Sequence, residues 1–124
     1  MKKISMSQID SLFKAIAQNE ALYIPTDKGD IAEFARYKDG MTLTEKYNTN
    51  RSAKDFFFPQ TENLMDFKTE GKTIEIIDTR KECEDFVLFG VRACDVKSFE
   101  ILDRVFLSEP VDTYYKNRRE HAVI

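Results

Sequence analysis

The sequence predicts a single α+β domain, with an α/β arrangement as the alternative, in which a small mixed sheet is flanked by about three helices. Apolar residues recur at helical spacing over residues 9–17 and again over residues 96–106. Between these segments, residues 86–91 form a continuous apolar run with the length of a strand buried on both faces. A chain of 124 residues, 42% of them hydrophobic, is long enough to build one core of its own.

The first third of the chain predicts a helix, two strands and a polar loop. The helix covers residues 9–17, and Ser7 is its expected N-cap. Strands are expected over 21–25 and 31–37, because a turn around Gly29 separates two runs that are rich in apolar residues. The polar residues that follow predict an extended surface loop.

Three adjacent phenylalanines, residues 56–58, stand in the middle of the chain. Ser52 is suited to cap a single helical turn before them, and Pro59 ends that turn. Burying each ring contributes roughly 1.5–3 kcal/mol, so we expect this cluster in the core or at a contact with another domain. Residues 62–67 fit either a short helix or an extended segment.

The second half of the chain alternates strands with helices. A strand is predicted over 73–78, a loop or short helix over 79–85, and then the buried strand described above. Asp95 is expected to open a helix that runs to residue 106, and residues 112–120 predict a third helix. The basic pair Arg118 and Arg119 in that helix fits either a solvated face or salt-bridge partners.

The chain ends in an apolar run at residues 121–124 that is typical of a strand. No polar tail follows it. We therefore expect these 124 residues to be the first piece of a longer protein.

Composition restricts the class of protein. The formal net charge is -3 and no basic stripe is present, so a nucleic-acid partner is not expected. No apolar stretch approaches the roughly 20 residues of a membrane span, and the N-terminus lacks the apolar segment of a signal peptide. We expect a cytoplasmic protein without membrane insertion, whose two cysteines stay reduced.

The candidate site is Cys94, where the buried strand runs into the second long helix. Unpaired backbone N–H groups and the helix dipole favour an anion at that position, and Arg92 adds positive charge while Asp95 opposes it. A reactive or metal-ligating thiol is one interpretation, and a small apolar core residue is the other. The second cysteine, Cys83, has acidic neighbours that raise a thiol pKa, so we expect it to be inert.

One thiol cannot hold a metal centre, because zinc and iron–sulfur clusters usually need four protein ligands. If Cys94 is a ligand, the others must come from residues outside this chain. A third interpretation is a thiol enzyme in which Arg92 activates Cys94 and His121 is the base. The sequence shows no nearby general base and no suitably spaced second cysteine to support it.

Four blocks of the sequence resemble one protein family: residues 52–62, 88–95, 101–106 and 112–120. The family consists of cytoplasmic iron–sulfur proteins and includes an iron–sulfur subunit of anaerobic sulfite reductase and the beta subunit of soluble nickel–iron (sulf)hydrogenases. The resemblance covers about half of the chain and is poor before Ser52. One difference is Ala93, where the family often has proline.

The resemblance implies an electron-transfer subunit of an anaerobic reductase or hydrogenase complex. Such proteins continue with a cysteine-rich segment and two ferredoxin-like four-cysteine runs, which are absent from residues 1–124. They hold [4Fe–4S] clusters and pass electrons to catalytic or flavin-containing partner subunits. We therefore expect an N-terminal domain that docks a partner, holds no cluster by itself and supplies Cys94 as one cluster ligand, with Arg92 beside it. The alternative is a non-redox structural or interaction domain with Cys94 in its core.

Overall fold

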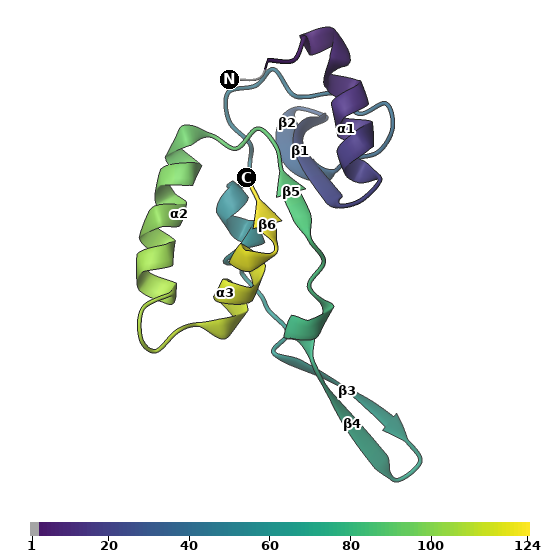
Figure 1. Cartoon of the computed structure of the whole chain (residues 1–124), viewed down its shortest axis with the longest axis vertical. Coiled ribbons are helices and arrows are strands. Elements are labelled where there is room, and N and C mark those ends of the chain that lie inside the picture. Colours follow the sequence, from purple (N-terminus) through teal and green to yellow (C-terminus); the bar gives the residue numbers. More distant parts are fainter. Residues whose placement is uncertain (1–2) are drawn as a thin grey trace.

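Four strands form a mixed sheet in the computed structural model, which describes residues 3–124 (Figure 1). Their order is β2-β1-β5-β6; β1 pairs antiparallel with β2 and parallel with β5, and β5 pairs parallel with β6. The bounds are Ala21–Lys28 for β1, Ile31–Arg36 for β2, Phe86–Leu88 for β5 and Ala122–Val123 for β6. A separate antiparallel hairpin consists of β3 (Met65–Glu70) and β4 (Thr73–Asp78).

Three α-helices accompany the sheet: α1 (Ile9–Ala17), α2 (Ala93–Phe106) and α3 (Thr113–Glu120). Short 3-10 turns lie at Met6–Gln8 (η1), Ala53–Phe56 (η2) and Thr79–Glu82 (η3). The predicted α+β fold with a small mixed sheet and three helices is confirmed. Within residues 3–124, no helix has both the length and the apolar character needed to cross a membrane.

The sheet is buried on both faces, as the apolar run at 86–91 predicts. Neighbouring side chains of a strand point to opposite faces, so β1 and β5 contribute to two core clusters. One cluster contains Phe13 of α1 with Leu22, Ile24 and Tyr37. The other, on the α2 and α3 side, contains Ala21, Ala53, Phe57, Phe86, Leu88, Phe99 and Tyr115.

Two predictions near the N-terminus were wrong. The strand β1 continues to Lys28, three residues beyond the predicted end, because Gly29 at φ +63° allows a two-residue turn that keeps Lys28 opposite Ile31. Ser7 does not cap α1, because the 3-10 turn η1 precedes that helix and Ser5 caps η1 instead.

The three phenylalanines have different environments. Phe57 is fully buried, Phe56 is half-buried against Tyr23 and Phe34, and Phe58 is 55% exposed. Phe57 packs edge-on against Phe99 of α2, with ring centroids 4.9 Å apart, and also contacts Phe86 and Tyr115. The expectation of a core position holds for the middle ring of the three.

Of the two conformations that the sequence allows for residues 62–67, the structure shows the extended one, which leads into a hairpin. The hairpin β3–β4 projects away from the rest of the molecule (Figure 1). Every residue of β3 is exposed.

Candidate functional site

The candidate site begins at Gly90, which follows β5 and turns the chain towards α2. Its φ is +78°, a conformation that side-chain-bearing residues rarely adopt. A Cβ at this position would lie 3.1 Å from Cγ and 3.2 Å from Cδ of Pro25 on the neighbouring strand β1. Both the backbone conformation and the close approach to Pro25 therefore require glycine here.

Cys94 lies in the first turn of α2, which begins two residues earlier than predicted. Arg92 has extended backbone angles and is the N-cap, and its carbonyl oxygen accepts hydrogen bonds from the N–H groups of Asp95 and Val96. The side chain of Cys94 is exposed. The alternative in which Cys94 is a core residue is therefore wrong about its position, and the thiol is accessible to a ligand or a partner.

Arg92 and Asp95 were expected to act on Cys94 through their charge, but both make structural hydrogen bonds. The Arg92 guanidinium donates from Nη2 to the carbonyl oxygen of Lys46, at 2.7 Å. Asp95 Oδ1 accepts from Ser52 Oγ at 2.6 Å, and Ser52 Oγ in turn accepts from the Lys54 N–H at the start of η2. These bonds attach the loop after β2 and the turn η2 to the start of α2.

The aromatic core beneath the site is held by an ion pair between α2 and α3. The Arg119 guanidinium donates to both carboxylate oxygens of Asp103, at 2.9 and 3.0 Å, and lies over the ring of Phe57. Tyr115 donates its hydroxyl to Asp103 Oδ1 at 2.6 Å. The hydrogen bond from Arg119 is the largest cause that holds the pKa of Asp103 below its usual value.

The residues that carry the family resemblance meet around this core. Ser52 and Phe57 come from the first block, Asp95 and Asp103 from the middle blocks, and Arg119 from the last. Arg118 also pairs with Glu62 of the first block and donates to the carbonyl oxygen of Phe57. Of the two roles expected for the basic pair, a solvated face or salt-bridge partners, the structure shows the second.

A hollow of about 580 Å³ lies between α2 and the carboxyl ends of β5 and β6. Open sheets commonly bind ligands beyond the carboxyl ends of their strands. The hollow is lined by Gly90, Val91, Val96, Phe99 and Ile124, among others. Ile124 therefore lies near the turn that leads to Cys94. The sequence did not predict this hollow, because the position of the last strand in the sheet cannot be read from the sequence.

Cys83 behaves as predicted, although the main cause differs. Its thiol is half-buried, and desolvation is the largest cause that raises its pKa. The neighbouring carboxylates of Asp85 and Glu84 raise the pKa further, whereas Arg118 opposes them. The direction agrees with an inert thiol.

His121, the base in the thiol-enzyme interpretation, pairs with Asp85. His121 Nδ1 lies 2.6 Å from Asp85 Oδ1, and its carbonyl oxygen accepts from the Phe86 N–H. In the described part of the chain, no hydrogen bond joins His121 to Cys94. Nor do the described side chains, which leave out those of residues 81–82, bring together three or more His, Cys, Asp or Glu that could hold a metal ion.

The chain is similar to a known protein along almost its whole length. Over 122 residues, or 98% of its length, the chain is 29% identical to Sulfhydrogenase 2 subunit beta of Pyrococcus furiosus. The chain spans 35% of the length of that relative. No family model matches the chain, and no solved structure matches it. This match agrees with the resemblance described above, because the family that the sequence resembles includes the beta subunits of (sulf)hydrogenases.

Proposed function

We propose that residues 1–124 form the N-terminal domain of an electron-transfer iron–sulfur subunit, which works in a cytoplasmic, anaerobic hydrogenase or reductase complex. The similarity to Sulfhydrogenase 2 subunit beta carries this proposal, because it extends over 98% of the chain. The iron–sulfur clusters belong to the part of such a protein that lies outside these residues.

Within this domain, Cys94 is proposed as one ligand of a [4Fe–4S] cluster. The exposed thiol at the first turn of α2 fits this role, since thiolates are the usual ligands of such clusters. The side chains that the structure describes include no group of three or more His, Cys, Asp or Glu that could complete a ligand set. The remaining ligands must then come from other parts of the protein. The cluster, when bound, supplies one-electron chemistry.

The chain's own contribution is to fix the position of that thiol. Gly90 sets the direction in which the chain leaves the sheet, and the hydrogen bond between Ser52 and Asp95 holds the first turn of α2. Ile124 lines the same hollow as Gly90, so a continuing chain would start on this side of the domain. This arrangement supports a short path from the end of β6 to the surroundings of Cys94.

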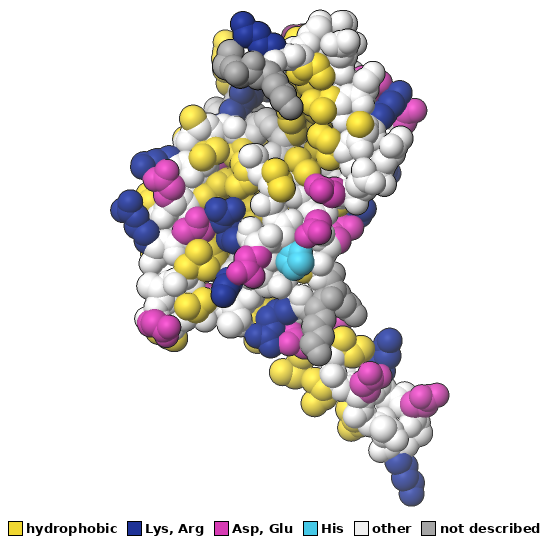
Figure 2. Space-filling view, viewed as in Figure 1, with side chains coloured by type: hydrophobic (Ala, Val, Ile, Leu, Met, Phe, Trp, Pro, Cys, Tyr) yellow, Lys and Arg dark blue, Asp and Glu magenta, His cyan; other side chains and the backbone are white. Residues whose placement is uncertain are grey.

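The proposed partner is a catalytic or flavin-containing subunit. Two places on α2 support docking: Ile101 and Val105, one helical turn apart, are 57% and 59% exposed, and Val96, which lines the hollow, is 42% exposed. In Figure 2, apolar side chains gather in the region between α2 and the sheet. Burying such surface stabilises a complex, whereas leaving it in water has a cost.

The test compares full-length protein with Cys94→Ser and, as the matched control, Cys83→Ser. Iron content, visible absorption and the electron paramagnetic resonance of the reduced protein are measured for each. We expect Cys94→Ser to lose or alter one cluster, while Cys83→Ser retains the wild-type spectrum. Identical cluster content and spectra in all three proteins would overturn the ligand role. A full-length protein without iron–sulfur clusters would overturn the whole proposal.

A further inference from the structure

The hairpin β3–β4 is amphipathic, although both of its faces are open to solvent. In the observed register Phe67 lies opposite Ile76, and Thr69 lies opposite Ile74. Alternation along the strands places these side chains and Met65 on one face. Met65, Phe67, Ile74 and Ile76 are 60%, 71%, 66% and 69% exposed. The other face carries the charged side chains Asp66, Lys68, Glu70 and Glu75.

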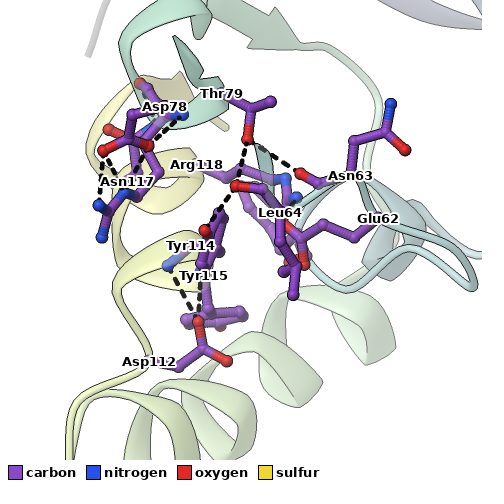
Figure 3. A network of polar contacts seen from close by, with 12 residues as sticks. Glu62, Asn63, Leu64, Asp78, Thr79, Asp112, Tyr114, Tyr115, Asn117 and Arg118 are labelled. Atoms are coloured by element: carbon purple, nitrogen blue, oxygen red, sulfur yellow. Dashed lines mark hydrogen bonds and ion pairs between the residues drawn. The ribbon is translucent and has the colours of Figure 1, made fainter. Parts of the chain in front are cut away.

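The base of the hairpin is fixed to the domain by hydrogen bonds, shown in Figure 3. Thr79 Oγ1 donates to the carbonyl oxygen of Asn63 at 2.9 Å, and Tyr114 of α3 donates its hydroxyl to the carbonyl oxygen of Leu64 at 2.7 Å. Asn117 of α3 donates its side-chain amide to the carbonyl oxygen of Arg80 at 3.0 Å. The hairpin is therefore an anchored arm that holds its apolar face away from the domain.

An isolated two-stranded hairpin is marginally stable in water, and it gains stability when further strands or a helix cover its apolar face. We propose that this face is covered by the same face of a second copy of the chain, so that two hairpins stack into a small four-stranded sandwich. Between Met65 and Thr69 on β3, and between Ile74 and Ile76 on β4, the apolar face carries no charge. Asp78 lies on the same face at the base of the hairpin, opposite Met65, and its carboxylate is paired with Arg80.

Two copies related by a two-fold axis form a closed dimer through this contact, because each copy contributes the same apolar face of its hairpin. Stacked sheets pack about 10 Å apart, and the projection of the arm leaves space for the second copy to approach (Figure 1). Four large side chains, each at least 60% exposed, offer at most on the order of 500 Å² per copy when they are buried completely, so the pair approaches the roughly 1,000 Å² at the lower limit of a specific interface. The expected assembly is a weak, concentration-dependent dimer.

The test is sedimentation velocity of the 124-residue chain over a wide concentration range that reaches the high micromolar. Phe67→Lys and Ile76→Lys place a charge in the stacked face, whereas Thr73→Lys adds the same charge on the opposite face, across from Glu70. We expect wild type and Thr73→Lys to dimerise equally, and both apolar-face variants to lose affinity by about tenfold or more, as expected when a central anchor is removed.

A folded wild-type chain that remains monomeric throughout would overturn the proposal. A dimer unchanged by Phe67→Lys and Ile76→Lys would overturn it equally. Circular dichroism separates loss of association from loss of folding, and Thr73→Lys shows whether an added lysine by itself disturbs the hairpin. None of these outcomes depends on whether Cys94 binds a cluster.

Discussion

Ser52 donates a hydrogen bond from its Oγ to Asp95 Oδ1, at 2.6 Å, across 43 residues of sequence. The same Oγ accepts from the Lys54 N–H and thereby caps η2. One hydroxyl thus fixes both the turn that carries Phe57 and the first turn of α2, where Cys94 lies. The position of the candidate thiol therefore depends on a serine that belongs to a different segment of the chain.

Ser52→Ala should lower the free energy of unfolding by about 1–2 kcal/mol, since it removes an N-cap and a hydrogen bond to a charged group. Ser108→Ala is the matched control, because its exposed hydroxyl bonds only the Val105 carbonyl oxygen one turn earlier. Its expected change is within about 0.5 kcal/mol. Urea unfolding followed by circular dichroism measures both, and equal losses would contradict the joint role of Ser52.

Gly90→Ala should destabilise the chain by more than Gly40→Ala. Both glycines have positive φ, at +78° and +84°, so alanine carries a conformational cost of about 1–2 kcal/mol at either position. A Cβ at Gly40 meets nothing within 4 Å, whereas at Gly90 it meets the ring of Pro25. The difference between the two variants in thermal or urea unfolding measures this contact. Equal effects would show that Pro25 moves aside freely.

Phe57→Ala should be among the most damaging single changes, with a loss of about 3–5 kcal/mol of unfolding free energy. The neighbouring Phe58→Ala is the control, because Phe58 is 55% exposed and packs its ring against Phe106. Its loss should be well below that of Phe57→Ala. Comparable losses in urea unfolding would mean that Phe58 is buried in solution.

These rings also show how far the sequence alone could predict the fold. Helical spacing located α1 and α2, and the apolar run at 86–91 predicted a strand covered on both faces, because periodicity and burial are local properties of the sequence. The spacing could not say which of three adjacent rings is central, since a short 3-10 turn sends them in different directions. The stripe of α2 likewise divides, with Phe99 buried and Val105 exposed.

The candidate site was predicted in part. A thiol at the start of a helix follows from the sequence near Cys94, and its exposure is a finding of the structure. The actual partners of Arg92 and Asp95 could not be predicted, because Lys46 and Ser52 are more than 40 residues away in sequence. Contacts of this kind depend on how the loop after β2 folds back, and no local pattern encodes that path.

The ion pair between Asp103 and Arg119 should make stability sensitive to acid. The pKa of Asp103 is lower in the folded chain than in the unfolded chain, chiefly because Arg119 donates to its carboxylate. This contribution is therefore fully present above the unfolded value of about 4 and is lost as the pH falls through the lower folded value. In Asp103→Asn, the unfolding free energy should therefore decrease less steeply than in the wild type as the pH falls below about 4.

Arg119→Met should flatten the same region of the profile, because it removes the main cause of the shift. Urea unfolding at a series of acidic pH values measures the three proteins. If the unfolding free energy of both variants falls with decreasing pH as steeply as that of the wild type, other carboxylates determine the acid sensitivity.

The 124-residue chain, treated with iron and sulfide under anaerobic conditions, should remain colourless and free of iron after desalting. A [4Fe–4S] cluster needs four protein ligands, and the chain has two cysteines, one exposed and one half-buried with a raised pKa. Iron analysis and visible absorption measure the outcome, with a full-length protein treated in parallel as the positive control. Stable colour that disappears in Cys94→Ser would show that this domain binds a cluster without ligands from elsewhere, and would contradict the division of ligands proposed above.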